Sequence, residues 1–258
     1  VYVVPGNHER SQIPYRLLAT HPNIHIFVRP KTFYLNIKGK ILALAGFPYV
    51  RDNILENFPR VLEETGWERK KSHARVLCIH HCIEGASLLM GERVYVFRNN
   101  SDVIRTADLN INAAAILTGH IHRFQVLTRD LNGGLLPVPV FYPGSTERTS
   151  FVEKDESKGY LVLEIEPGGV GDSGTVSNWK FIELPARPMK IIEINARGMT
   201  AGGLQENIVR RLKDIDADSV VNLRISGAKN GCLEVLKAEN LRKLAPGTMN
   251  FKLSVPTK

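Results

Sequence analysis

The sequence has no apolar stretch approaching the roughly 18 residues that a membrane-spanning helix needs. Its first residues also lack the charged-then-apolar pattern of a secretory signal. These absences predict a cytoplasmic protein with no membrane partner. At 258 residues and 43% hydrophobic, the chain has room for one large core and one small core.

Cysteine is scarce as well, and the three present form no disulfide framework. Cys78 and Cys82 flank His80 and His81, which invites a zinc interpretation. However, there is no second cysteine pair, and Cys78 lies within an apolar stretch that reads as a strand. We therefore expect reduced, buried thiols.

Acidic residues are fewer than basic ones: the sequence has 26 Asp and Glu and 34 Lys and Arg. From residue 187 to 258 there are 13 basic and 7 acidic residues, so most of the net charge of +8 lies in the last part of the chain. Such a surface suits a polyanionic partner, although a solvated basic face without a partner is the plain alternative.

The most informative motif is Thr118-Gly119-His120-Ile121-His122, directly after the apolar run 113–117. In extended backbone, residues two apart point to the same side, so His120 and His122 are expected to face one space. Paired imidazoles at a sheet edge suit a divalent transition metal.

Two more apolar runs end in similar side chains. Residues 1–6 lead into Asn7 and His8, and residues 76–79 lead into His80 and His81. In open α/β sheets, ligands bind at the carboxyl ends of the strands. A lone histidine at a strand end is usually structural, but three such sites together predict a metal centre.

These blocks resemble the third, fourth and fifth signature blocks of the calcineurin-like metallophosphoesterases. Tyr142-Pro143-Gly144-Ser145, Glu147-Arg148 and the later Lys158-Gly159 narrow the resemblance to the SbcD-type DNA repair exonucleases. The resemblance covers about residues 1–185. It implies an α/β (α+β) fold, a mixed β-sandwich flanked by helices, and a small α/β capping domain at 186–258 that holds DNA.

The resemblance also implies roles. Asn7, His80 and His120 would ligate one metal ion and His122 a second, with Mn²⁺ as the implied metal, while His8 would protonate the leaving oxygen. His80 is favoured over His81 as the ligand. His81, Ser145 and Arg148 are candidates for supporting the ligands or contacting substrate. In the cap, Arg210, Arg211 and Lys213 are candidate DNA contacts.

The family's Asp-x-His block is absent, and Gly171-Asp172, the one Gly-Asp, comes after the metal blocks. We therefore expect an N-terminally truncated chain that is inactive by itself. The implied partners are DNA, a coiled-coil ATPase of the SbcC type and a second copy of the chain, in the cytoplasm at the nucleoid. The alternatives are a generic phosphatase or cyclic-nucleotide phosphodiesterase, and a non-catalytic DNA-end-binding subunit.

Hydrophobic periodicity and turn residues predict the main elements. The prolines at 185 and 188 mark the domain boundary. The ranges predicted as strands are 24–27, 32–37, 40–46, 74–80, 94–97, 113–118, 125–127, 140–142, 160–166, 176–184, 189–194, 219–226 and 249–255; helices are expected at 14–20, 53–67, 203–213 and 237–244.

Overall fold

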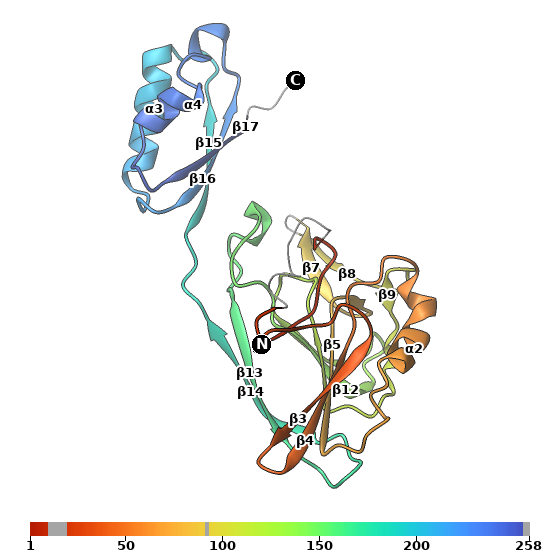
Figure 1. The fold of residues 1–258 in the computed structure, drawn as a ribbon. Coiled ribbons are helices and arrows are strands. Elements are labelled where there is room, and N and C mark those ends of the chain that lie inside the picture. The colour runs from red at the N-terminus through yellow and green to blue at the C-terminus, as the bar shows by residue number, and fades with distance from the viewer. Residues whose placement is uncertain (10–19, 91–92, 255–258) are drawn as a thin grey trace. The chain divides into compact units, whose positions relative to one another are not determined.

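The computed structural model describes residues 1–9, 20–90 and 93–254 (Figure 1). Most of the helix expected at 14–20 lies outside these ranges. The chain divides into two compact units, each described by itself below. The first comprises Val1–Glu147 and Ser157–Leu184, and the second comprises Arg148–Glu156 and Pro185–Lys258.

The first unit is built around a six-stranded sheet in the order β11-β12-β10-β5-β4-β3. Neighbours from β12 to β4 run parallel, while β11 and β3 are antiparallel to the strands beside them. The bounds are β3 Lys31–Ile37, β4 Lys40–Gly46, β5 Ala74–Ile79, β10 Ala115–Thr118, β11 Gln125–Arg129 and β12 Leu135–Tyr142.

Apart from Arg75 at the start of β5, the central strands β5 and β10 are largely apolar on both faces, because both faces of the sheet are covered. Helix α2 (Ile54–Glu64) packs Ile54, Phe58 and Val61 into the core that contains Leu77 and Ile79 of β5. Its amino end is capped by Asn53, whose side chain accepts a hydrogen bond from the Glu56 amide.

The opposite face is covered by the hairpin of β13 (Gly159–Glu166) and β14 (Thr175–Glu183). The ring of Phe181 stacks on Phe124 at 4.3 Å, and Trp179 contacts Phe141 at 6.1 Å between centroids. Phe141 alternates with Val140 and Tyr142, which belong to the helix-side core, so it points to the hairpin side. Two layers therefore enclose the sheet.

Shorter elements connect these layers, and they pair as β1 with β2, β6 with β9, and β7 with β8. Their bounds are β1 Tyr2–Val3, β2 His25–Ile26, β6 Cys82–Ile83, β7 Ser87–Met90, β8 Arg93–Val96, β9 Val103–Ile104 and η1 Thr106–Leu109.

Several boundaries differ from the prediction, and two of these differences have a clear physical reason. Helix α2 ends at Glu64 rather than at residue 67, because Gly66 takes a left-handed conformation with φ of 64°. Strand β12 begins five residues earlier than expected, at Leu135. Its prolines, Pro137 and Pro139, lie where the register with β11 shifts between Leu127 and Arg129, so they interrupt few ladder hydrogen bonds.

The second unit has a three-stranded parallel sheet in the order β15-β16-β17, with helices α3 and α4 in the crossovers (Figure 1). Its core includes Ile192, Leu204, Ile208, Leu212 and Leu223. The bounds are η2 Phe151–Glu153, β15 Met189–Asn195, α3 Ala201–Lys213, β16 Val220–Ser226, η3 Asn230–Cys232, α4 Ala238–Lys243 and β17 Asn250–Ser254.

The predicted α/β fold class is confirmed: a mixed, strand-rich sheet is combined with few helices. None of the helices that the structure describes has the length and apolar character required to cross a membrane.

Candidate metal centre

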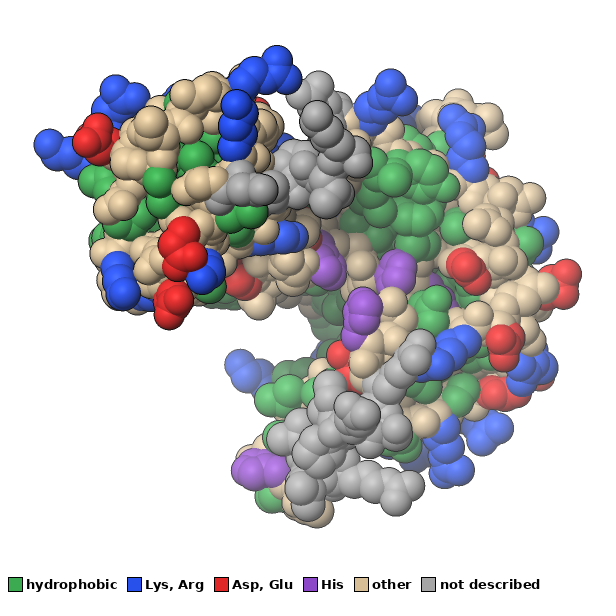
Figure 2. Space-filling model, turned by 90° about the horizontal axis from the view of Figure 1, so that it is seen from above, with side chains coloured by type: hydrophobic (Ala, Val, Ile, Leu, Met, Phe, Trp, Pro, Cys, Tyr) green, Lys and Arg blue, Asp and Glu red, His purple; other side chains and the backbone are tan. Residues whose placement is uncertain are grey.

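The parallel strands of the first unit end at one edge of the sheet. The register aligns Gly46 of β4 with Cys78 of β5, Cys78 with Leu117 of β10, and Leu117 with Phe141 of β12. Residues that follow these strands are therefore brought together. Several histidine side chains lie close to one another on the face shown in Figure 2.

Three of the predicted ligands converge at this edge. The Oδ1 atom of Asn7 lies 3.2 Å from Nε2 of His80 and 3.4 Å from Nδ1 of His120. The two imidazole rings meet edge to face, with centroids 5.4 Å apart. An amide oxygen and two ring nitrogens from three separate segments thus point into one space.

Two glycines make room for the His80 ring. A Cβ atom at Gly6 would lie 2.6 Å from Cε1 of His80, and one at Gly119 would lie 2.6 Å from its Nδ1. Both distances are too short for any side chain, so the glycines permit backbone to approach the imidazole from two directions. The Gly6 amide also donates a hydrogen bond to the Glu9 carboxylate, which closes the turn around Asn7.

His81 is fully buried beneath this site. Its Nε2 accepts a hydrogen bond of 3.0 Å from the Val50 amide. The carbonyl of His81 accepts hydrogen bonds from the hydroxyls of Thr118 and Tyr142, at 2.9 and 3.1 Å. This buried position favours a supporting role for His81 over contact with substrate. The hydrogen bonds of His81 anchor the segment that carries His80.

Sequence reasoning missed Tyr49, whose ring lies among the histidines. It stacks on His81 at 4.7 Å and on His120 at 5.8 Å, and it meets His80 edge to face at 6.3 Å. Its amide donates to the Pro5 carbonyl, which links the end of β4 to the Asn7 turn. The feature of the sequence that could have indicated Tyr49 is its position shortly after the carboxyl end of the parallel strand β4.

The predicted geometry of the His120–His122 pair was wrong. Strand β10 ends at Thr118, and His120 has a left-handed φ of 75°, so the two residues do not alternate along an extended strand. The charge of His122 nevertheless contributes to lowering the pKa of both His80 and His120. The charge of His8 acts on the same two rings, and His8 and His122 are both exposed.

The loop at His122 is held by the later sequence blocks. The His122 carbonyl accepts hydrogen bonds from the Ser145 amide at 3.1 Å and from Nζ of Lys158 at 2.9 Å. Gly144, with φ of 77°, packs so closely that a Cβ would lie 2.8 Å from the same carbonyl oxygen. The hydroxyl of Ser145 donates to the Glu147 carbonyl within its own turn.

The other residues that the sequence analysis proposed as substrate or DNA contacts lie in the second unit. Arg148 donates hydrogen bonds from its guanidinium to the carbonyls of Glu156 and Arg187, so its side chain fastens two segments of that unit. Arg210, Arg211 and Lys213 are exposed on α3, away from its buried residues Leu204, Ile208 and Leu212.

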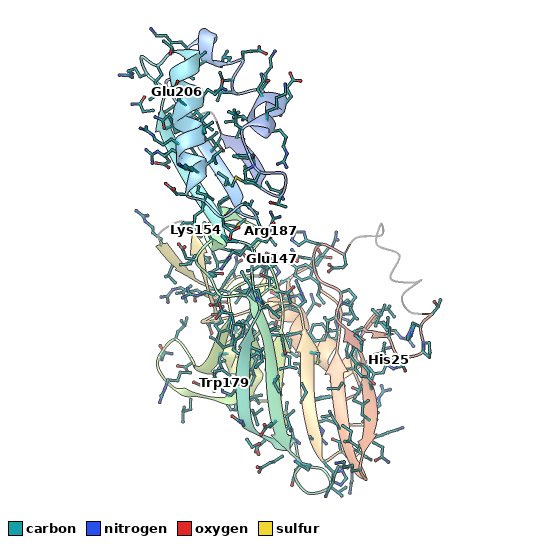
Figure 3. The ribbon with its side chains drawn as sticks, turned by 90° about the vertical axis from the view of Figure 1, so that its left-hand side faces the viewer. His25, Glu147, Lys154, Trp179, Arg187 and Glu206 are labelled. Atoms are coloured by element: carbon teal, nitrogen blue, oxygen red, sulfur yellow. The ribbon has the colours of Figure 1, made fainter. Side chains whose placement is uncertain are left out.

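Outside the cluster, His25 stacks on Tyr2 at 4.9 Å near the sheet edge, on the other side of the first unit from Trp179 (Figure 3).

Burial keeps the clustered imidazoles neutral. It lowers the pKa of His80 to about 4, an effect that the charge of His120 increases and Glu9 opposes. Burial likewise lowers the pKa of His81 to about 3 and shifts that of His120 downwards. Near pH 7 the rings therefore carry lone pairs, which is the form that binds a metal.

The donor atoms of Asn7, His80 and His120 fit one of the two predicted metal-ion positions. Donors bound to one ion at about 2.1 Å lie roughly 3.0–3.4 Å apart in octahedral or tetrahedral geometry, which matches the spacing around Asn7. However, within the described ranges no group of three or more His, Cys, Asp and Glu side chains is arranged to hold a metal. Asn7, His80 and His120 therefore fit one divalent ion through neutral ligands, and the described residues do not complete a two-ion site.

Residues 1–124 match the model of the calcineurin-like phosphoesterase family. The matched range contains Asn7, His8, His80, His120 and His122 and ends before the Tyr142 block. No curated protein matches the chain. Phosphoesterases of this kind are metal-dependent hydrolases, and over residues 1–124 the chain carries a calcineurin-like metallophosphoesterase domain.

Proposed function

We propose that the chain forms part of the nuclease subunit of a DNA double-strand-break repair complex, of the SbcD type. Its reaction is hydrolysis of DNA phosphodiester bonds with two divalent ions, most suitably Mn²⁺. The observation that supports this best is the convergence of Asn7, His80 and His120 at the carboxyl ends of parallel strands. Such an edge is where α/β sheets place their ligands.

In this proposal Asn7, His80 and His120 hold one ion, and His122 approaches the second. Two bound ions supply Lewis acidity and an activated water for phosphodiester hydrolysis. Gly6 and Gly119 fix the His80 ring between them. His8, exposed beside the cluster, donates a proton to the leaving oxygen, a role suited to imidazole.

DNA is favoured as the substrate by two features. The last 72 residues carry the excess of basic charge, which suits a polyanion. The Tyr142–Ser145 and Lys158–Gly159 blocks also resemble those of the SbcD-type nucleases, and Ser145 and Lys158 contact the His122 loop. The same resemblance supports a coiled-coil ATPase and a second copy of this chain as partners.

A second candidate is DNA-end binding without cleavage. It is favoured because, in the described part of the chain, no group of three or more His, Cys, Asp and Glu side chains is arranged to hold a metal. Neutral ligands bind a divalent ion without the bridging anion on which two-ion hydrolysis depends. The two candidates share the DNA-binding surface and differ only in chemistry.

Metal binding by the 258-residue chain tests the centre itself. We expect titration with Mn²⁺, followed by electron paramagnetic resonance, to show one ion per chain. The variants His80→Ala and His120→Ala should weaken binding at least tenfold, whereas His21→Ala, which removes an exposed histidine, should leave it unchanged. Equal binding by all three variants would place the ion elsewhere. This chain alone should not cleave DNA above background, and robust Mn²⁺-dependent cleavage would contradict that.

Substrate class is tested in the protein as its gene encodes it. With Mn²⁺ we expect degradation of linear double-stranded DNA, and His8→Ala should lower turnover at least a hundredfold while Mn²⁺ binding is retained. His21→Ala is the matched control. Hydrolysis of p-nitrophenyl phosphate or a cyclic nucleotide without DNA cleavage would instead identify a generic phosphatase or cyclic-nucleotide phosphodiesterase. DNA binding without cleavage would identify the end-binding subunit.

A further inference from the structure

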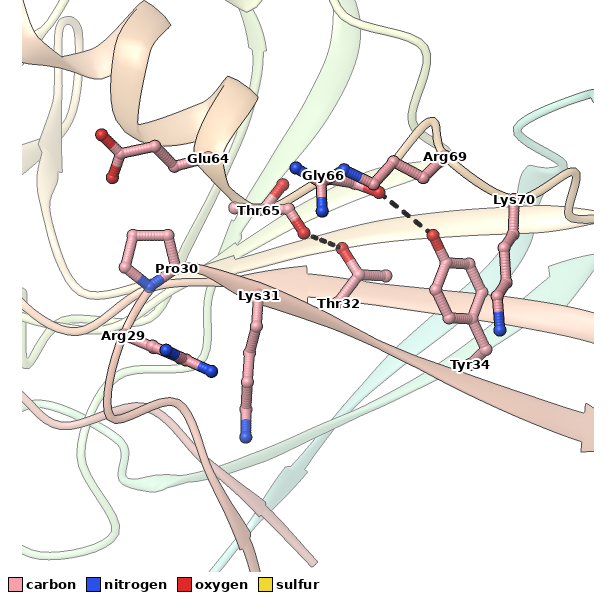
Figure 4. A pocket seen from close by; sticks show the side chains of 10 residues that line it. All are labelled: Arg29, Pro30, Lys31, Thr32, Tyr34, Glu64, Thr65, Gly66, Arg69 and Lys70. Carbon is pink, nitrogen blue, oxygen red and sulfur yellow. Dashed lines mark hydrogen bonds between the residues drawn. The ribbon is translucent and has the colours of Figure 1, made fainter.

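A basic hollow lies on the first unit between the start of β3 and the loop that follows α2 (Figure 4). Its volume is about 610 Å³, within the range of ligand sites. Four cationic side chains line it: Arg29 and Lys31 from the entry to β3, and Arg69 and Lys70 from the loop after α2. No histidine of the metal centre is among its lining residues.

Among the described residues, the cations of this hollow have no acidic side chain as a partner. The carboxylate that lines the hollow, Glu64, is already paired with Arg60 one helical turn away. A ligand entering here would therefore meet cations whose charges are available to it.

Two hydrogen bonds join β3 to the loop after α2 beneath the hollow. The Thr32 hydroxyl donates to the Thr65 carbonyl at 3.0 Å, and the Tyr34 hydroxyl donates to the Gly66 carbonyl at 3.2 Å (Figure 4). The left-handed Gly66 turns the chain so that Arg69 lies directly over it, and a Cβ at position 66 would be 2.8 Å from Cδ of Arg69. These contacts hold together the two segments that carry the four cations.

Aromatic rings, rather than carboxylates, accompany the two lysines. Nζ of Lys31 lies 4.2 Å from the Phe33 ring centroid, and Nζ of Lys70 lies 5.2 Å from that of Tyr34. Burial, and secondly the like charge of Arg29, lower the pKa of Lys31. A bound anion would relieve this repulsion.

We propose that this hollow binds consecutive phosphate groups of one ligand, the chemistry shared by a nucleic-acid backbone and an inorganic polyphosphate chain. Guanidinium groups such as those of Arg29 and Arg69 bind phosphate oxygens in pairs, and ammonium groups add charge. The volume and the four cations suit more than one phosphate. The site requires no metal, so it goes beyond the proposed function and stands or falls separately from it.

The test measures binding in metal-free buffer containing EDTA, where hydrolysis plays no part. A short fluorescein-labelled single-stranded oligonucleotide is titrated by fluorescence anisotropy at several salt concentrations, and tripolyphosphate is added as a competitor. The test variant is Arg69→Ala with Lys70→Ala, both exposed side chains. The matched control, Lys40→Ala with Lys180→Ala, removes two exposed lysines of the same unit that do not line the hollow.

We expect the test variant to bind about tenfold more weakly and its slope of log K against log salt to flatten by about 1.4, or 0.7 per lost phosphate contact. The control should stay within about twofold of the parent protein. Displacement of the oligonucleotide by tripolyphosphate would show that a phosphate chain suffices, and lack of displacement would identify the nucleic-acid backbone as the ligand. Equal behaviour of the test and control variants would overturn the proposal, because only net charge would then matter.

Discussion

Nζ of Lys158, a buried side chain, donates a hydrogen bond of 2.9 Å to the carbonyl oxygen of His122. The same oxygen accepts the amide of Ser145, so two later segments of the chain converge on one carbonyl of the metal-centre loop. Lys158 begins the hairpin that covers the sheet, one residue before β13. The hairpin therefore does more than shield the core, because it also positions the loop that carries His122.

Replacing Lys158 with methionine tests this contact. Methionine keeps most of the apolar stem but removes the donor, so we expect the free energy of unfolding to fall by about 1–3 kcal/mol, typical of a charge-assisted hydrogen bond. The imidazole signals of His122 in NMR spectra should broaden or shift, while those of His25 remain. Lys180→Met, on the exposed surface of β14, is the matched control and should change stability by less than about 0.5 kcal/mol. Equal stability of the two variants would show that the contact contributes nothing.

The second prediction concerns the packing of Gly119 against His80. A methyl group at position 119 would meet Nδ1 of His80 at 2.6 Å, so Gly119→Ala must displace the ring or the loop. We expect Mn²⁺ affinity to fall at least tenfold. Gly202→Ala, where an added Cβ meets open space, should leave affinity unchanged. If Gly119→Ala binds Mn²⁺ normally, His80 is not a ligand or its position tolerates the methyl group.

Much of the fold follows from local patterns that the sequence displays. Apolar runs predict β5 and β10, and Lys38-Gly39 predicts the tight turn between β3 and β4, where both residues have positive φ. The end of α2 depended on the left-handed conformation of Gly66, which the helical period alone does not reveal. The amino end of β12 was missed because its two prolines argue against a strand unless a register shift accommodates them.

The candidate site was predictable only in part, for a related reason. The rule that ligands lie at strand ends identifies Asn7, His80 and His120 as neighbours. It does not provide the conformation of the loop after β10, where the left-handed His120 replaces the expected extended pair. The roles of Tyr49 and Lys158 were missed because they arise from stacking and hydrogen bonding between segments distant in sequence.

The third prediction concerns the thiols of Cys78 and Cys82, near the metal centre. Burial raises the pKa of Cys78 and of Cys82 to about 12, so almost no thiolate is present at pH 8. We expect Ellman's reagent to modify neither residue in the folded protein and both after denaturation in guanidinium chloride. Mass spectrometry after alkylation at each stage identifies the residues. Rapid modification of Cys82 in the folded state would contradict its burial.

The basic face of α3 makes the last prediction. Arg210, Arg211 and Lys213 are exposed there, and substitution by alanine keeps a strong helix former at each position, so the fold of the second unit should be retained. If these side chains contact DNA phosphates, replacing all three should flatten the dependence of log K on log salt by about 0.9 per lost contact on duplex DNA. Affinity should fall about equally for all sequences, because phosphate contacts carry no base information.

The matched control for α3 replaces Lys190, Lys229 and Lys252, which are exposed elsewhere in the same unit. It removes the same charge, so a larger effect of the α3 variant assigns the contact to that helix. Both variants are measured in the protein as its gene encodes it, by fluorescence anisotropy with labelled duplexes of unrelated sequence. If the α3 variant keeps the parent affinity and salt slope, the helix presents only a solvated face, and DNA must bind through other cations.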